Sequence, residues 1–169
     1  MKNYKFCPYC GAQNSLKART ESEYQCSACE QLLWDNPRAT VAVILQNDQG
    51  ELAYAERAVE PNKGKFDFPG GFVEYNEDIY HACARELKEE MGISVDTEAL
   101  HIVTAYTLEY LPGVSVMDTI IVSDMWHGDI QAQDDVASIV WKPIEFIDNE
   151  QFAPAYPGLV EKLRPYLKK

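Results

Sequence analysis

The sequence predicts an α+β domain whose mixed β-sheet is covered on both faces, preceded by a small zinc ribbon built on four cysteines. Two Cys-x2-Cys motifs lie within the first 36 residues, runs of β-branched and aliphatic residues recur between residues 39 and 142, and one long helical segment lies among them. A chain of 169 residues is long enough for one domain with a full core and a small appendage. We therefore expect a ribbon at residues 1–36 and a larger domain at residues 37–169.

The ribbon is predicted by the spacing of its cysteines. Cys7 and Cys10 form one Cys-x2-Cys pair, Cys26 and Cys29 form the other, and fifteen residues separate the pairs. This is the spacing of a four-cysteine zinc site. Two disulfides are the alternative, and the lack of a signal peptide makes them less favoured. Four thiolate ligands leave no open position, so we expect the zinc to be structural.

Aromatic residues are dense in this module. We expect them to cover a thin core or an interface, and stacking on nucleic-acid bases is the alternative. The module carries four basic and four acidic residues and has no basic stripe, which argues against the second interpretation. The aromatic residues are Tyr4, Phe6, Tyr9, Tyr24 and Trp34.

The first strands of the larger domain follow the boundary at residues 35–37. Residues 39–45 are aliphatic and β-branched, residues 46–50 form a turn, and residues 51–56 are expected to return as the second strand of a hairpin. Short strands are expected at residues 66–68 and 72–74, on either side of a glycine pair.

The one long helix is expected at residues 77–91. Asn76 is a suitable N-cap, Glu77 and Asp78 in the first turn suit the helix dipole, and Gly92 suits the C-cap. Its apolar stripe includes Cys83, which we interpret as core filling rather than a ligand.

The remaining elements are mostly strands. Residues 100–111 and 114–126 are expected to form two long strands around a Pro-Gly turn, and residues 138–142 form another strand. Residues 144–149 are expected to form a short helix or turn, and residues 156–167 a closing helix. Three strand aromatics are expected in the core, with base stacking as the alternative: Tyr106, Tyr110 and Trp126.

Carboxylates concentrate on one side of the predicted helix. Glu86, Glu89 and Glu90 stand at i, i+3 and i+4, so they project from a single turn, and two of them share the arc of the apolar stripe. Carboxylates among apolar groups are costly without a positive partner. Arg85 can pair with one of them, and a divalent cation would balance the rest. Oxygen ligands of this kind suit magnesium or manganese better than zinc.

This segment resembles the signature of the Nudix hydrolase family. The pattern G-x5-E-x7-R-E-U-x-E-E-x-G-U, where U is aliphatic, is matched at every fixed position from Gly71 through Glu77 to the run at residues 85–93. The preceding residues 66–70 also resemble the family, although Phe66 stands where tryptophan is more common. The resemblance covers roughly residues 38–147. It implies an α/β/α sandwich with a mixed sheet, the Nudix fold.

The resemblance also implies the chemistry: magnesium-dependent hydrolysis of the phosphoanhydride bond in a nucleoside diphosphate linked to another group. It makes Glu86 and Glu90 the principal magnesium ligands, joined by Glu89 and by the carbonyl of Gly70. Arg85 and Glu77 would pair and orient the cluster.

The water-activating base and the substrate contacts have further candidate residues. Glu89 is our first candidate for the base that activates water, with Asp135 as a distal candidate and a solvated turn as the alternative for Asp135. Arg57 is a candidate phosphate contact, with a surface ion pair as its alternative. Gly71 would allow close approach of the substrate to the backbone.

The negative charge of the chain argues against some classes of binding partner. The formal net charge is −12, and because the first 36 residues are balanced, the larger domain carries the whole excess. Such a body disfavours nucleic acid and anionic membranes. No apolar stretch predicts a signal peptide or a membrane span, so we expect a cytoplasmic protein. The resemblance also suggests a homodimer.

Three interpretations of the substrate remain open. A zinc ribbon before this domain resembles the NADH pyrophosphatases, but residues 95–113 lack the S-Q-P-W-P-F-P-x-S-like segment of that group. ADP-ribose, FAD or another nucleoside diphosphate linked to a further group is the broader expectation, and NADH or NAD is the narrower alternative. A nucleotide sensor without catalysis is the third interpretation, and the intact set of glutamates argues against it.

Overall fold

The computed structural model describes residues 4–123 and 125–168, which form two units that meet between Pro37 and Arg38 in the sequence. The first unit is a three-stranded antiparallel sheet in the order β1 (Leu16–Ala18), β2 (Glu23–Cys26) and β3 (Leu32–Trp34). Two of the five aromatic residues expected to cover its core do so: Tyr24 is buried, and Tyr4 packs edge-on against the Tyr24 ring. Phe6, Tyr9 and Trp34 are more than half exposed.

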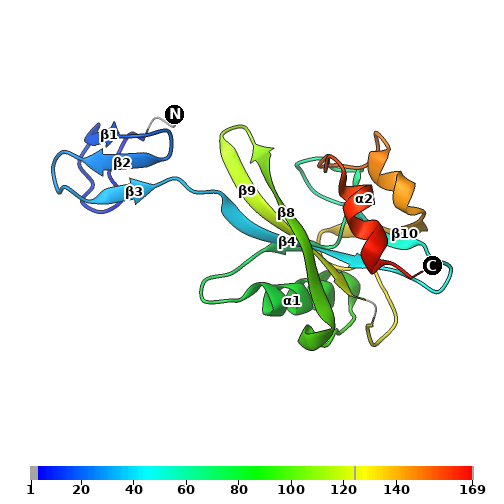
Figure 1. Ribbon diagram of the computed structural model, residues 1–169. Coiled ribbons are helices and arrows are strands. Elements are labelled where there is room, and N and C mark those ends of the chain that lie inside the picture. The colour runs from blue at the N-terminus through cyan, green and yellow to red at the C-terminus, as the bar shows by residue number, and fades with distance from the viewer. Residues whose placement is uncertain (1–3, 124, 169) are drawn as a thin grey trace. The chain divides into compact units, whose positions relative to one another are not determined.

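The larger unit is built around a mixed four-stranded sheet in the order β7-β4-β9-β8 (Figure 1). β4 and β9 run parallel, and the other neighbours are antiparallel. The expected hairpin of β8 and β9 around Gly113 is present. The bounds are β4 (Arg38–Leu45), β7 (Gly70–Phe72), β8 (Leu100–Leu111) and β9 (Val114–Ser123).

A second, antiparallel sheet contains β10 (Val136–Lys142), β5 (Leu52–Arg57) and β6 (Phe66–Asp67), in that order. This sheet shows that the predicted hairpin of residues 39–45 and 51–56 is wrong. The turn at residues 46–50 closes with a single bridge between Gln46 and Leu52, after which β5 enters the second sheet. The edge of β4 that a hairpin partner would need is already paired with β7 on one side and β9 on the other.

The two faces of the mixed sheet belong to different cores. Val41, Val43 and Leu45 of β4 pack with Leu87 and other buried residues of helix α1 (Ile79–Met91). The alternate residues Ala42 and Ile44 pack with the aromatic core on the opposite face, which includes side chains from η2 (Ile144–Asp148) and α2 (Leu159–Leu163). The expected sandwich is confirmed: helices cover both faces (Figure 1).

Helix α1 begins two residues later than predicted, and its N-cap differs. Asp78 is the N-cap, because its Oδ1 accepts from the backbone N–H groups of Tyr80 and His81. Asn76 instead has a φ of 63° in the preceding turn. Gly92 ends the helix as predicted, with a φ of 70°. The later start leaves the Glu77 side chain free to reach Arg85.

The closing helix is shorter than predicted. Gly158, with a φ of 70°, precedes α2, and a 3-10 turn η3 (Arg164–Tyr166) follows it. Pro165 has no N–H to extend the helical hydrogen bonds. Tyr156 therefore lies before the helix, where its ring joins the aromatic core.

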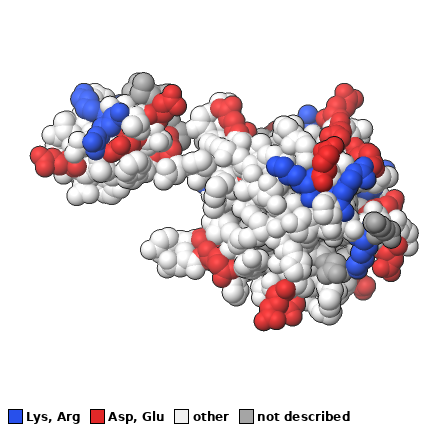
Figure 2. Space-filling model, viewed as in Figure 1, with Lys and Arg blue, Asp and Glu red and all other residues white. Residues whose placement is uncertain are grey.

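Charge on the larger unit is spread unevenly. Acidic side chains form several separate groups on the face shown in Figure 2, and basic side chains are fewer there. Among the described residues, no helix is both long enough and apolar enough to cross a membrane.

Candidate active site

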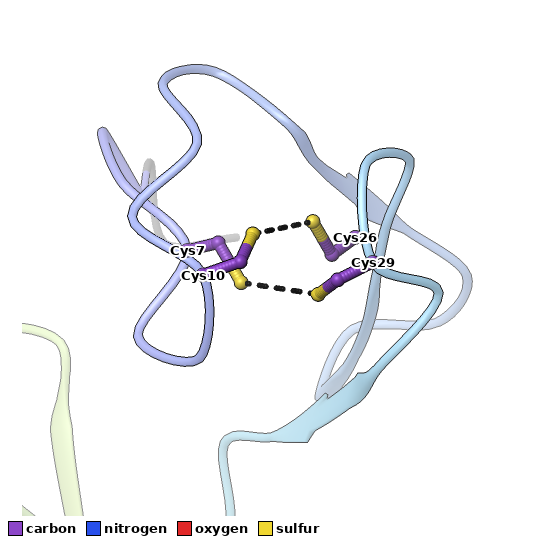
Figure 3. Close-up of side chains that lie close together, drawn as sticks. All are labelled: Cys7, Cys10, Cys26 and Cys29. Carbon is purple, nitrogen blue, oxygen red and sulfur yellow. Dashed lines mark hydrogen bonds between the residues drawn. The ribbon is translucent and has the colours of Figure 1, made fainter.

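Four cysteine sulfurs converge in the first unit. Cys7 and Cys10 point toward Cys26 and Cys29 from two facing turns (Figure 3). Their Sγ atoms all lie within 4.8 Å of one another, and the distances Cys7–Cys29 and Cys10–Cys26 are 3.9 and 3.7 Å. Sulfurs placed about 2.3 Å from a tetrahedral zinc would be about 3.8 Å apart. The cluster therefore fits a zinc ion.

Ser15 supports this cluster from the side. Its Oγ lies 3.2 Å from Sγ of Cys26, and this hydrogen bond is the main reason why the pKa of the Cys26 thiol falls to about 6. The thiolate is the form that binds metal. Within the described part of the chain, the four cysteines are the one set of three or more such ligands whose atoms gather this closely.

A cavity of about 330 Å³ in the larger unit brings together most of the predicted site residues. Its walls come from both sheets, from α1 and from the loop before β10. Glu77 and Glu89 are outside the lining; both pair with Arg85, which lines the cavity, and Glu77 also accepts from the N–H of the lining residue Glu74. The predicted residues that line it are Arg57, Gly70, Gly71, Arg85, Glu86, Glu90 and Asp135.

The two glycines bring the backbone of β7 against the helix carboxylates. The N–H of Gly70 donates to Oε2 of Glu90 at 2.8 Å. A Cβ on Gly71 would lie 2.5 Å from Oε1 of Glu86, and a Cβ on Gly70 would lie 2.1 Å from the carbonyl oxygen of Val41. Gly70 also has a φ of 146°, which L side chains rarely adopt. Gly70 therefore requires glycine, whereas a side chain at residue 71 would displace the Glu86 carboxylate from its position.

Arg85 organises the carboxylates at the surface of α1. Its Nε and Nη2 donate to both oxygens of Glu77 at 2.9 Å, and Nη1 donates to Glu86 at 2.8 Å and to Glu89 at 3.1 Å. Nη2 also donates to the carbonyl of Phe72 at 2.9 Å, which ties the helix to β7. These bonds lower the pKa of Glu77 below its usual value. Bidentate pairing of this kind fixes orientation as well as charge.

Glu90 is the deepest of the helix carboxylates. It is 7% exposed, and burial, together with the charges of Glu86, Asp135 and Asp67, raises its pKa to about 9. Burial likewise raises the pKa of Glu86, with Glu89 and Asp135 adding to it. Neither carboxylate has a cation that offsets this cost fully, although Arg85 contacts Glu86. Oxygen donors left in this condition suit a hard divalent cation.

Arg57 and Asp135 lie at the rim formed by β5 and the loop before β10. Nε of Arg57 donates to the carbonyl of Pro61 at 2.7 Å, and its Nη1 lies 3.5 Å from Oδ2 of Asp67. The carbonyl of Asp135 accepts from the N–H of Ala58, which joins this loop to β5. Asp134, with a φ of 51°, precedes it and also lines the cavity.

Sequence reasoning missed the polar residues at the end of the cavity that meets the sheet face turned away from α1. Asp118 of β9 is 7% exposed, and its oxygens accept from the Thr40 and Tyr156 hydroxyls. Asp67 of β6 lies nearby. The signal that could have found Asp118 is a carboxylate inside the otherwise aliphatic strand at residues 114–123.

The other residues singled out in the sequence have structural environments. Cys83 is fully buried in the core beside α1. Trp126 stacks on Trp141, and the Tyr106 hydroxyl donates to the carbonyl of Pro157. Of the three strand aromatics, Tyr110 alone lines the cavity.

Comparisons with known proteins agree on the fold. The model of the NUDIX domain family matches residues 36–163. A protein of Vibrio atlanticus (strain LGP32) named NAD-capped RNA hydrolase NudC is 26% identical over 88% of this chain and 58% of its own length. An ADP-ribose pyrophosphatase of Methanocaldococcus jannaschii is 32% identical over 69% of this chain and 64% of its own length. The crystal structure of a NUDIX hydrolase from Nitrosomonas europaea superposes with a TM-score of 0.65 at 24% identity, over 96% of this chain and 90% of that one. The chain thus spans about three fifths of the length of these two curated relatives.

Proposed function

This chain belongs to the NUDIX domain family, and on that basis we propose that it hydrolyses the phosphoanhydride bond of a nucleoside diphosphate linked to another group. The observation that carries the proposal is the pair Glu86 and Glu90. Their carboxylates line a cavity large enough for a nucleotide portion, and each approaches a backbone glycine. Burial raises the pKa of both carboxyl groups, as expected for metal ligands that lack enough neighbouring positive charge to balance them.

We propose that Glu86 and Glu90, with the carbonyl of Gly70, hold magnesium or manganese, and that Glu89 completes the set. A bound ion of this kind would neutralise the diphosphate and lower the pKa of a water molecule. Arg85 would keep Glu86 in place through the pairing with Glu77, which is a positioning role. Arg57, fixed by Pro61, would face a phosphate oxygen, and Gly71 would let the substrate approach the backbone.

The water-activating base is assigned to one of two carboxylates. Asp135 lines the cavity. The Glu89 side chain does not line it; this side chain is about half exposed and pairs with Arg85. This supports Asp135, although the family resemblance favours Glu89. A base must come within hydrogen-bond reach of the water it activates. We therefore expect the variant of the base, Asp135→Asn or Glu89→Gln, to lower kcat about 100-fold or more even at saturating magnesium. A loss in Glu89→Gln that is due only to weaker metal binding should instead be recovered as the magnesium concentration is raised.

The test of the proposed function is hydrolysis of a nucleotide panel with magnesium: ADP-ribose, NADH, NAD, FAD, diadenosine polyphosphates, nucleotide sugars and deoxynucleoside triphosphates. Turnover of one class that is lost in Glu86→Gln and Glu90→Gln supports the proposal. Metal-dependent binding without turnover anywhere would replace it with the nucleotide-sensor interpretation.

NADH or NAD is the second candidate substrate. The match to the relative from Vibrio atlanticus extends over 88% of this chain, so it reaches into the four-cysteine unit. That relative is named for NAD-capped RNA, which joins a nicotinamide dinucleotide to RNA. Preference for NADH or NAD over ADP-ribose in the panel would select this alternative, and comparison with 5′-NAD-capped RNA would test whether RNA is accepted.

We propose that the ion held by the four cysteines is a structural zinc. One equivalent of zinc in the purified protein, lost with Cys7→Ser and Cys26→Ser, is the expected result. Because the larger unit has its own two cores, hydrolysis should survive in these variants. A cytoplasmic location and a homodimer stay predictions.

A further inference from the structure

At one end of the cavity, two polar residues interrupt an otherwise apolar face of the sheet. On β4, Thr40 precedes Ala42 and Ile44 on the face turned away from α1, and on β9 its partner Asp118 precedes Ile120 and Val122. The four later residues belong to the aromatic core, whereas Thr40 and Asp118 line the cavity. Asp118 is thus a carboxylate placed where the core opens to the cavity.

Hydroxyl groups hold Asp118 in a fixed orientation. Oδ1 accepts from Oγ1 of Thr40 at 2.8 Å, and Oδ2 accepts from the hydroxyl of Tyr156 at 2.5 Å. The ring of Tyr156 is itself fixed against Phe68 and Phe152. Each carboxylate oxygen can accept two hydrogen bonds, so each keeps one unused acceptor position. Among the described residues, no Lys or Arg side chain forms an ion pair with Asp118.

A second fixed acceptor lies at the same end. Oδ1 of Asp67 accepts from the N–H of Phe68 at 2.8 Å, and Oδ2 lies 3.5 Å from Nη1 of Arg57. Asp67 also lines the cavity. It is near enough to Asp118 for that charge, after burial itself, to raise the pKa of Asp67. Asp67 and Asp118 both line the cavity, and they are linked through Phe68, which follows Asp67 and whose ring packs against Tyr156, the residue that donates to Asp118. Leu108 and Val116, paired across β8 and β9, also line the cavity.

We propose that Asp118 and Asp67 form the nucleobase subsite and select bases that present an amino group, such as adenine, over bases that present a carbonyl at the same place. This inference rests on the proposed function, since it names the part of the nucleotide that each end of the cavity receives. Two anionic acceptors repel phosphate, so the diphosphate is left to Arg57 and to the cation that Glu86 and Glu90 would hold. The apolar residues cover the faces of the base.

The chemistry of the two carboxyl groups determines the direction of the preference. An exocyclic amino group donates to a carboxylate oxygen, and such charge-assisted bonds are stronger than neutral ones. A carbonyl at the same position places two acceptors together and leaves both without a donor, which costs more than a hydrogen bond contributes. Hypoxanthine has a carbonyl in place of this amino group, but it also carries an N–H donor at N1 where adenine has an acceptor. Purine riboside 5′-monophosphate, which lacks the amino group and keeps the N1 acceptor, is therefore the matched probe and is measured beside IMP.

The experiment measures equilibrium binding of AMP and IMP by calorimetry, and hydrolysis of the adenine and hypoxanthine forms of whichever diphosphate the panel selects. We expect the wild type to prefer the adenine form about 10-fold or more in Kd and in kcat/KM. Asp118→Asn supplies an amide that can donate to a carbonyl, so it should remove or reverse the preference. The change should be in KM, with kcat within a few fold. Asp129→Asn, the same substitution at an exposed aspartate, should leave the preference intact.

The outcomes separate the inference from the proposed function. Absence of all turnover with AMP still preferred over IMP would overturn the hydrolase and leave the subsite standing. Turnover with equal binding of AMP and IMP, or an unchanged preference in folded Asp118→Asn, would overturn the subsite alone. Should Asp118→Asn fail to fold, Asp67→Asn is measured in the same way, and an unchanged preference there overturns the proposal.

Discussion

The two ends of the cavity hold carboxylates by different means. At the end formed by α1, a guanidinium contacts three carboxylates at once, while Oε2 of Glu90 accepts from the N–H of Gly70. At the end formed by β9, neutral hydroxyls of Thr40 and Tyr156 hold Asp118. Positive charge suits groups that must be positioned yet remain anionic for a cation. Hydroxyl donors fix a carboxylate without occupying all of its acceptor positions, which suits recognition of a neutral base.

The largest effect that this comparison predicts is at Glu90. Glu90→Gln removes a buried charge needed by the cation, so we expect kcat to fall about 1,000-fold or more. The same change removes the cost of burying a carboxylate whose pKa is raised to about 9, so the melting temperature of the larger unit should rise by a few degrees. Kinetics with magnesium measure the first effect. Thermal unfolding without magnesium measures the second, because a bound ion would itself stabilise the wild type.

Glu161→Gln is the matched control for this variant. Glu161 is exposed in the first turn of α2, far in sequence from the carboxylates of α1, and should change neither activity nor stability. Loss of activity together with loss of stability in Glu90→Gln would contradict the interpretation, because it would make Glu90 a structural residue.

The next prediction tests whether the Arg85 site needs the several hydrogen bonds of a guanidinium group or only a positive charge. Arg85→Lys keeps the charge but cannot make the bidentate pair with Glu77 while contacting Glu86. We expect kcat/KM to fall 10- to 100-fold, which corresponds to roughly 1.4–2.7 kcal/mol. Arg164→Lys, at an exposed pair with Glu145, should have no effect. An Arg85→Lys enzyme with full activity would show that charge alone is sufficient.

The two ends also differ in how far the sequence predicts them. The α1 end comes from residues 70–90, so helical spacing and two glycines place its groups together before any tertiary contact is known. The four cysteines are predicted for the same reason. The other end joins Thr40, Asp67, Asp118 and Tyr156, which meet only because β4 pairs with β9 and the segment before α2 folds onto that sheet. The hairpin predicted for residues 39–45 and 51–56 is wrong for the same reason: β4 and β5 pair with strands distant in the sequence rather than with each other across the turn.

A smaller effect is expected from one hydroxyl at the β9 end. Tyr156→Phe leaves Oδ2 of Asp118 buried without its donor, so the larger unit should lose about 2 kcal/mol of unfolding free energy. Tyr106→Phe removes a hydroxyl that donates to the carbonyl of Pro157 at a more exposed site, and should cost less than half as much. Urea unfolding of both variants measures the difference. Equal losses would mean that the Tyr156 bond carries no special role in holding Asp118.

The smallest effect is a pH dependence of stability from Asp67. Its pKa is about 7 in the folded protein and near 3.8 when unfolded, so between these values the folded form keeps a proton that the unfolded form has released. Stability therefore falls as the pH rises from about 4 to 7, and the fall ends above pH 7. Asp67→Asn cannot ionise, so its advantage over the wild type should grow by about 1–2 kcal/mol between pH 5 and 8; this range allows for the partial exposure of the side chain. Urea midpoints at the two pH values measure it, and subtraction of the wild type removes the contribution of every other acid. An advantage that shrinks as the pH rises would mean that the pair with Arg57 dominates, and that Asp67 belongs with the carboxylates held by guanidinium groups.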